Sequence, residues 1–143
     1  MTYEYLEHTA DVAVRLRSKD GEELFSDATR ALLSIFVDAE AGSPVRPIEK
    51  QALDLEAEDA EALLVDYLNQ LIFLFDTRRF LGADVRVLEL SLGKPSQLKA
   101  IVEGETFDPE RLSLKTEIKA ATFHGIEIRK TPSGLETVIV FDL

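Results

Sequence analysis

The stretch from residue 59 to about residue 78 constrains the fold more than any other part of the chain. Asp59 can cap a helix there, and apolar residues recur at intervals of three and four. The apolar surface of this helix is broad: it comprises Leu63, Leu64, Tyr67, Leu68, Leu71, Ile72, Leu74 and Phe75. A helix with so wide an apolar surface must be largely covered by a sheet.

Alternating apolar and polar residues supply the strands for such a sheet. They predict strands at residues 3–7, 12–17, 48–56, 85–92, 98–105 and 135–143, with further strand-like stretches at 114–120 and 126–129. A first helix is predicted at residues 22–37, with Ser18 or Asp20 as its cap. The fold class that we expect is α+β: a single domain over residues 1–143, in which two helices pack on one face of a mostly antiparallel, mixed β-sheet. Five phenylalanines lie mostly at helical spacing and are expected in the core: Phe25, Phe36, Phe73, Phe75 and Phe80.

Composition excludes several classes of function. The chain of 143 residues has no cysteine, which rules out disulfides, thiolate catalysis and a zinc-finger site. Its formal net charge of −11 argues against DNA or RNA binding as its main function, because neutralising phosphates requires a basic surface. No apolar run is long enough to cross a bilayer. These features fit a cytoplasmic protein that meets a basic protein surface or collects cations.

Three polar or charged stretches interrupt or end the predicted strands. Asp11 is a ligand or base, or else a turn residue that bonds a backbone amide. Lys119 and His124 could bind an anion or a substrate, or else they stand on a solvated strand face and in a turn. Asp142 ends the last strand and is followed by Leu143 with its terminal carboxylate. Each stretch, taken alone, is explained at least as well by its structural role, and the chain shows no nucleophile motif or glycine-rich phosphate loop.

Taken together and in this order, these stretches resemble the archease family. The resemblance is carried by EHTADV at residues 7–12, KAATFH at 119–124 and VIVFDL at 138–143, and LLVDYLNQL at 63–71 looks like the family's second helix. It covers the whole chain. It implies a small cytoplasmic protein that is not itself an enzyme. Such a protein assists an RtcB-type RNA ligase in tRNA splicing, by promoting guanylylation of the ligase and its repeated turnover.

The resemblance also implies a site. Family members hold a divalent metal ion through residues matching Asp11, Asp142 and Leu143, so we expect Ca²⁺ here, with Mg²⁺ or Mn²⁺ as alternatives. Strand ends at Asp11 and Asp142 could meet at one sheet edge, and three carboxylates suit a hard cation. Lys119 is carried over as functionally important, whereas His8 and His124 fall in matching motifs without an assigned role. The expected partner is the ligase, with tRNA involved only indirectly and no role for DNA or a membrane.

Two other functions remain open from the residues. The first is a general protein-interaction or chaperone-like module, whose acidic C-terminal cluster docks on a basic partner. The second is a small metal-dependent hydrolase. The lack of a nucleophile–base pair counts against the hydrolase, although one metal-bound water would suffice.

Overall fold

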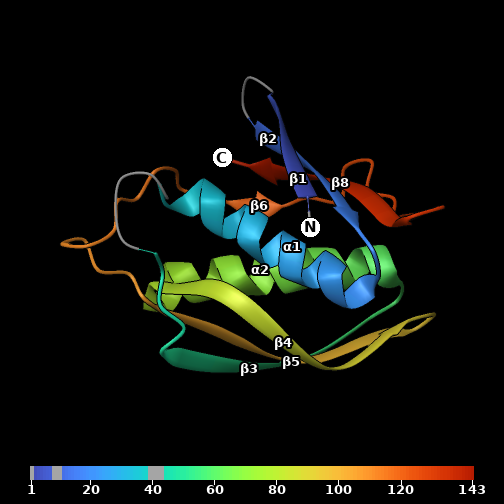
Figure 1. The fold of residues 1–143 in the computed structure, drawn as a ribbon, viewed down its shortest axis with the longest axis horizontal. Helices are drawn as coiled ribbons and strands as arrows, with labels where there is room; N and C mark the ends of the chain where they lie inside the picture. Colours follow the sequence, from blue (N-terminus) through green and yellow to red (C-terminus); the bar gives the residue numbers. More distant parts are fainter. Residues whose placement is uncertain (1, 8–10, 39–43) are drawn as a thin grey trace.

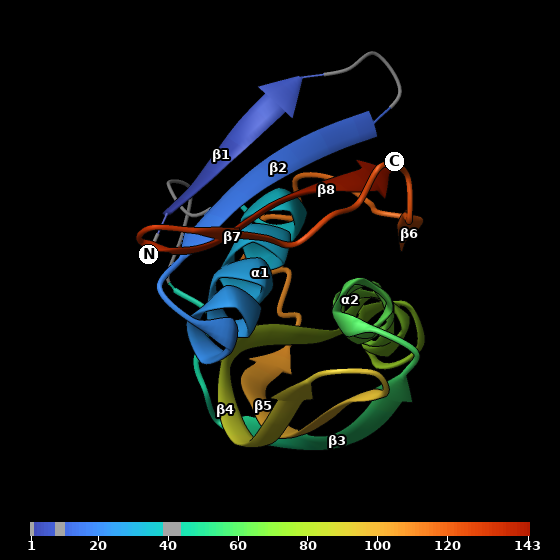
Figure 2. The same cartoon turned by 90° about the vertical axis from the view of Figure 1, so that its right-hand side faces the viewer.

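The computed structural model describes residues 2–7, 11–38 and 44–143, and it places two helices between two β-sheets (Figures 1 and 2). The elements are β1 (Thr2–Glu7), β2 (Asp11–Ser18), α1 (Gly21–Phe36), β3 (Glu49–Ala57), α2 (Ala60–Arg78), β4 (Phe80–Leu92), β5 (Ser96–Thr106), β6 (Ala120–Ala121), β7 (Arg129–Thr131) and β8 (Gly134–Asp142). The five-stranded sheet has the order β1-β2-β8-β6, with β7 also paired to β8, and the three-stranded sheet has the order β3-β5-β4. Every pairing between these strands is antiparallel.

The two helices begin where side-chain caps were predicted. The Asp20 carboxylate accepts the backbone N–H of Glu23 at 2.9 Å, and the Asp59 carboxylate accepts that of Ala62 at 2.8 Å. Each bond satisfies one of the amides that a helix leaves without a partner in its first turn. Helix α2 ends at Arg78, and the following cap residue, Arg79, takes the left-handed conformation with φ of 55°.

The α+β class, with two helices packed against antiparallel strands, is confirmed. The strands form two sheets rather than one, and the helices fill the space between them (Figure 2). The breadth of the α2 stripe explains this arrangement, because both Tyr67 and Leu64 are fully buried and need cover on more than one side. Helices α1 and α2 are joined in the core by a 2.6 Å hydrogen bond between the hydroxyls of Thr29 and Tyr67. Burial raises the pKa of Tyr67, so this hydroxyl stays neutral.

Two expectations were wrong in detail. The alternation over residues 114–120 and 126–129 yields only the two short strands β6 and β7. Elsewhere in this segment the backbone bonds to other partners: Lys115 N–H donates to Phe36 O at 2.7 Å, and Ile128 N–H donates to a Glu61 carboxylate oxygen at 2.8 Å. Phe73 is 56% exposed on the outer side of α2, whereas the other four phenylalanines expected in the core are buried.

The pairing of β2 with β8 joins the two ends of the chain. It runs without a break from Ser18 opposite Leu135 to Asp11 opposite Asp142. Strand β8 begins at Gly134, where φ is +146° and an added Cβ would lie 2.1 Å from the carbonyl oxygen of Ser18. Only glycine fits at this position, so the start of β8, and hence its register, depends on that residue.

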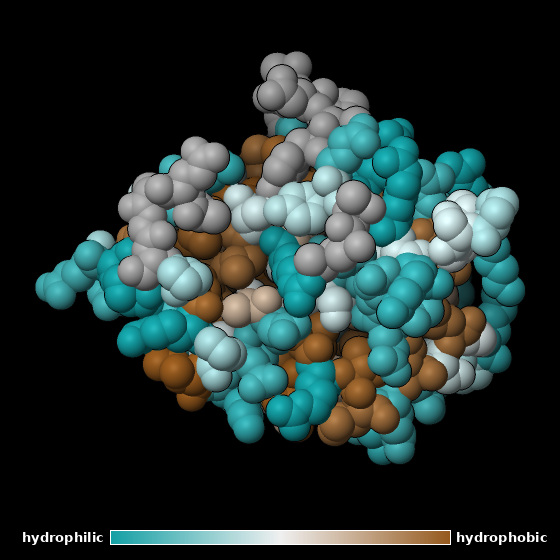
Figure 3. All heavy atoms as spheres, viewed as in Figure 1, coloured by the Kyte–Doolittle hydropathy of each residue, from teal (hydrophilic) through white to brown (hydrophobic). Residues whose placement is uncertain are grey.

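Hydrophilic residues cover much of the face drawn in Figure 1, with apolar areas between them (Figure 3). Within the described ranges, no helix has the length and apolar character that a membrane span requires.

A buried carboxylate stabilises the loop that enters β3. Glu105 is 2% exposed, and its carboxylate accepts the backbone N–H of Arg46 at 2.5 Å and the guanidinium groups of Arg46 and Arg111. Burial alone would raise the pKa of Glu105, but the hydrogen bonds from Arg111 and Arg46 outweigh it and hold the pKa below its ordinary value. Arg111 also donates to Pro44 O at 3.1 Å, so the cluster ties residues 44–46 to the rest of the fold.

We predict that Glu105→Gln lowers the free energy of unfolding at pH 7 by roughly 2–3 kcal/mol, because two guanidinium groups lose a buried charged acceptor. A depressed folded-state pKa stabilises the protein above the unfolded-state value of about 4.5, and this contribution is lost as the pH falls through the folded-state pKa. The difference between wild type and variant should therefore shrink below about pH 4.5. Urea unfolding followed by circular dichroism at pH 7, 5 and 4 measures it.

Glu103→Gln is the matched control on the same strand. Among the residues that the structure describes, its carboxylate pairs only with Arg86, at 3.6 Å and near the surface, so a change within about 1 kcal/mol is expected. Equal losses in the two variants, or a Glu105→Gln effect that persists unchanged at pH 4, would contradict the role given to Glu105.

Candidate metal centre

Two carboxylates from opposite ends of the chain meet at one end of the five-stranded sheet. Asp11 is the first residue of β2, Asp142 is the last of β8, and the two are direct partners in the antiparallel ladder. Direct partners project their side chains from the same face, with Cβ atoms about 4.5–5.5 Å apart. The side chains of the next pair, Val12 and Phe141, point toward the helices, and Phe141 is buried there. Asp11 and Asp142 therefore lie together on the outer face.

Lys119 and Leu143 lie at the same end. The backbone N–H of Lys119 donates to Asp142 O at 2.9 Å, and the next residue, Ala120, is the β6 partner of Asp142. Leu143 directly follows Asp142 and is 37% exposed. A pocket of about 330 Å³ is lined by Asp76, Arg79, Glu117, Ile118, Lys119 and Leu143. Four of the residues predicted from the sequence, Asp11, Lys119, Asp142 and Leu143, are thus gathered around the end of β8.

The chemistry of this donor set fits a hard cation. Asp11 and Asp142 offer carboxylate oxygens from one face, and the main-chain oxygen of Leu143 follows immediately in the chain. Ca²⁺ and Mg²⁺ prefer such oxygen ligands and complete their shells with backbone carbonyls and water. Within the described residues no three His, Asp or Glu side chains cluster as a metal site would require. Side chains would therefore supply at most two ligands here, and a bound cation would take its further oxygens from the main chain or solvent.

The two predicted histidines have different outcomes. His8 lies outside the residues that the structure describes. His124 is exposed in the turn that follows β6, where Ile126 N–H donates to Phe123 O at 3.3 Å and Gly125 has a positive φ of 62°. The backbone N–H of His124 donates to the Thr122 hydroxyl at 3.3 Å. The structure thus gives His124 a place in a turn, and a functional role for it stays a prediction.

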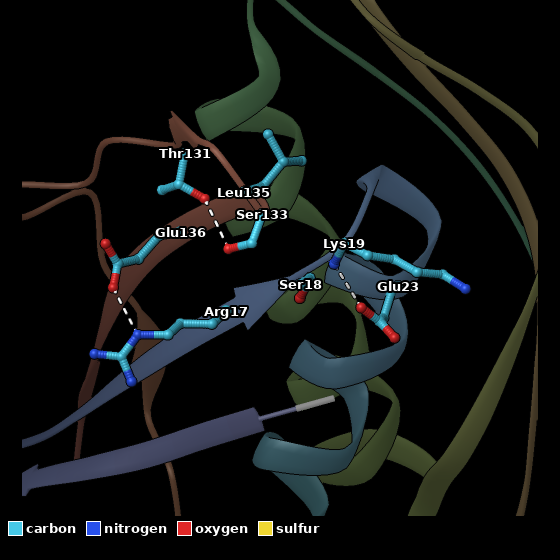
Figure 4. Close-up of a pocket in the computed structure, with 8 residues that line it drawn as sticks. All are labelled: Arg17, Ser18, Lys19, Glu23, Thr131, Ser133, Leu135 and Glu136. Carbon is cyan, nitrogen blue, oxygen red and sulfur yellow. Dashed lines mark hydrogen bonds and ion pairs between the residues drawn. The ribbon is translucent and has the colours of Figure 1, made fainter.

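A second pocket, of about 440 Å³, lies at the far end of the β2–β8 pairing (Figure 4). Arg17 there points to Glu136, with Nε 2.9 Å from the carboxylate, and the Lys19 side chain extends away from the hydroxyls of Thr131 and Ser133. The positively charged groups of Arg17 and Lys19 therefore do not both point into this pocket. Because Ser18 and Asp11 are at opposite ends of β2, this pocket is separate from the candidate metal centre.

One contact beside the site was missed from the sequence. Asn69 of α2 bonds both backbone groups of Ala121 in β6: its amide donates to Ala121 O at 3.1 Å, and its carbonyl accepts Ala121 N–H at 2.8 Å. The available signal was a side-chain amide within a helix whose neighbours are mostly apolar. Its partner is 52 positions away, so the sequence did not indicate where the amide would bond.

Comparison with known proteins gives the family. The model of the archease protein family matches residues 3–143, which is nearly the whole chain. The chain belongs to the archease family. The resemblance carried by the three motifs and the second helix is thereby confirmed.

Similar archeases come from several archaea. That of Methanosarcina mazei is 35% identical over 142 residues, covering 99% of this chain and 95% of the relative. That of Methanopyrus kandleri is 32% identical and covers 100% of both chains. That of Thermococcus gammatolerans is 37% identical over 132 residues, covering 92% and 91%.

Solved structures agree with the fold of this archease. The solution structure of a Methanobacterium thermoautotrophicum protein superposes with a TM-score of 0.78 at 25% identity, covering 99% of this chain and 98% of that one. A crystal structure from Thermotoga maritima, described as an archease and "possible chaperone", gives a TM-score of 0.60 at 24% identity, covering 96% and 94%. The latter likeness is one of fold.

We predict opposite effects of Asp142→Asn with and without a divalent cation. In EDTA, the variant should be more stable by about 0.2–1 kcal/mol, because two like charges no longer face each other across the ladder. With Ca²⁺ added, wild type should gain stability through binding to the folded state, and the variant should gain much less. Thermal unfolding across a Ca²⁺ titration measures both effects.

Asp76→Asn is the matched control, because Asp76 lines the pocket beside Leu143 but has no place in the β2–β8 ladder. It should respond to Ca²⁺ as wild type does. An equal Ca²⁺ response in Asp142→Asn and wild type would rule out Asp142 as a ligand.

Proposed function

We propose that this archease is a non-catalytic, metal-binding accessory protein that activates an RtcB-type RNA ligase in tRNA splicing. It promotes guanylylation of the ligase and its repeated turnover, with the cytoplasm as its compartment. The observation that carries the proposal is the direct pairing of Asp11 with Asp142 beside Leu143. Family membership supports the accessory role, and the carboxylate pair gives that role a chemical basis.

The residues of the candidate metal centre have different roles in this proposal. Asp11, Asp142 and the Leu143 carboxylate would hold Ca²⁺, or Mg²⁺ or Mn²⁺ in its place. A bound ion of this kind supplies positive charge and open coordination positions to oxygen ligands of a partner. Asp142 is exposed and Leu143 is 37% exposed, so a partner can reach this end of the molecule. Lys119 lines the pocket that adjoins Leu143 and supplies a cation there.

A second candidate is a protein-interaction module that docks without metal. It is favoured by exposed apolar side chains on α2, after β6 and after β8: Phe73 and Phe123 are 56% and 58% exposed, and Leu143 is 37% exposed. Exposed aromatic side chains are typical of surfaces that bind other proteins. In this alternative the acidic cluster serves only to attract a basic partner.

Extending the chain by three glycines after Leu143 separates the two candidates. Every side chain stays in place, but the terminal carboxylate moves away from Asp142. We expect Ca²⁺ affinity and stimulation of ligase guanylylation to fall together. The measurements are calorimetric titration with Ca²⁺, and guanylylation and turnover assays with the purified ligase, GTP and cleaved tRNA.

The same three glycines placed before Met1 form the control, and they should leave both quantities unchanged. Full stimulation by the C-terminally extended protein would reject a role for the terminal carboxylate and favour docking alone. Turnover of nucleotides or phosphoesters by the protein in the absence of ligase would overturn the non-catalytic role.

A further inference from the structure

Strand β6 is too short to hold itself in place. It has two residues, Ala120 and Ala121, and pairs with β8 at the edge of the five-stranded sheet. Thr122 N–H donates to Val140 O at 2.9 Å, so the chain faces β8 at that residue. Backbone groups of successive strand residues point to opposite sides, and those of Ala121 therefore point away from β8.

Asn69 occupies the position of the next strand. Ala121 is 4% exposed, so its N–H and C=O need partners within the protein. The Asn69 side chain supplies both, accepting at 2.8 Å and donating at 3.1 Å. Only an amide side chain offers a donor and an acceptor side by side as a peptide does. Helix α2 thereby bonds the outer edge of β6 while β8 bonds its inner edge.

This clamp is one residue from the candidate metal centre. Ala120, which precedes Ala121, is the direct partner of Asp142, and Lys119 N–H donates to Asp142 O at 2.9 Å. A shift of β6 would move the Lys119 amide away from Asp142 and leave the end of β8 paired with β2 alone. Ile128, farther along the same segment, is bound to α2 separately, through Glu61 at 2.8 Å.

We propose that Asn69 is a positioning residue for the metal centre. Its amide holds β6 against β8, and β6 in turn holds Lys119 and the end of β8, including Asp142, in the arrangement that binds the cation. The role of Asn69 in cation binding rests on the proposed function. The hydrogen bonds between Asn69 and Ala121 do not depend on it.

Asn69→Ala tests the proposal, with Glu61→Ala as the matched control. Each variant removes side-chain bonds between α2 and the segment of residues 118–128, but of these two side chains only that of Asn69 hydrogen-bonds β6. The first readout is amide hydrogen exchange by NMR in EDTA. In Asn69→Ala, exchange at Lys119 and Thr122 should be at least about tenfold faster than in Glu61→Ala. The second readout is Ca²⁺ affinity by calorimetry, which should fall roughly 10–100-fold in Asn69→Ala and stay near wild type in Glu61→Ala.

Each outcome of these measurements supports or rejects a positioning role for Asn69. Unchanged exchange at Lys119 and Thr122, or equal changes in both variants, would overturn the clamp. Faster exchange with unchanged Ca²⁺ affinity would show a structural contact only and would overturn the positioning role. If wild type binds no Ca²⁺, the metal part of the proposed function fails, and the exchange comparison still decides whether Asn69 holds β6. If Asn69→Ala does not fold, Asn69→Asp, which keeps the acceptor and loses the donor, takes its place with the same expected directions.

Discussion

The antiparallel pairing of β2 with β8 is the interaction on which the rest of the structure depends. Its register puts Val14 and Leu16 of β2 on the face that covers the helices, beside Ile139 and Phe141 of β8, and all four are almost fully buried. A slip of one residue would turn these side chains to solvent and bring the charged neighbours inward. The same register sets Asp11 opposite Asp142. The hydrophobic core therefore stabilises an arrangement of two like charges that would not form by itself.

Much of the architecture followed from local patterns. The period of the apolar residues predicted both helices and most strands. Asp59 was correctly predicted as a cap, and Asp20 was one of the two residues proposed for the other helix. The division into two sheets could not be predicted, because alternation indicates that a strand has an inner face without indicating which strand it pairs with. The segment from residue 114 to 129 shows the limit most clearly. Its alternation is real, yet the amides of Lys115 and Ile128 bond to a helix end and a helix side chain.

The candidate site was partly predictable for a different reason. Asp11 and Asp142 stand at strand ends, and strand ends on one sheet edge are close in space, so the polar residue type and its position together indicated the pair. Asn69 carried no such signal, since an amide in a helix bonds whatever backbone the tertiary fold brings to it. Phe73 was misplaced for a related reason: an apolar residue among Ile72 and Leu74 reads as core, but its helical angle turns it outward. Local pattern thus indicates which groups need partners, and tertiary pairing decides which partners they obtain.

The central claim is that the end of the β2–β8 ladder binds a divalent cation. Crystals grown with Mn²⁺ and measured near the manganese absorption edge test it most directly, because an anomalous difference map locates the ion itself. We expect a peak within about 2.0–2.6 Å of carboxylate oxygens of Asp11 and Asp142. A map with no peak at this pair, at a Mn²⁺ concentration that stabilises the protein in solution, would contradict it.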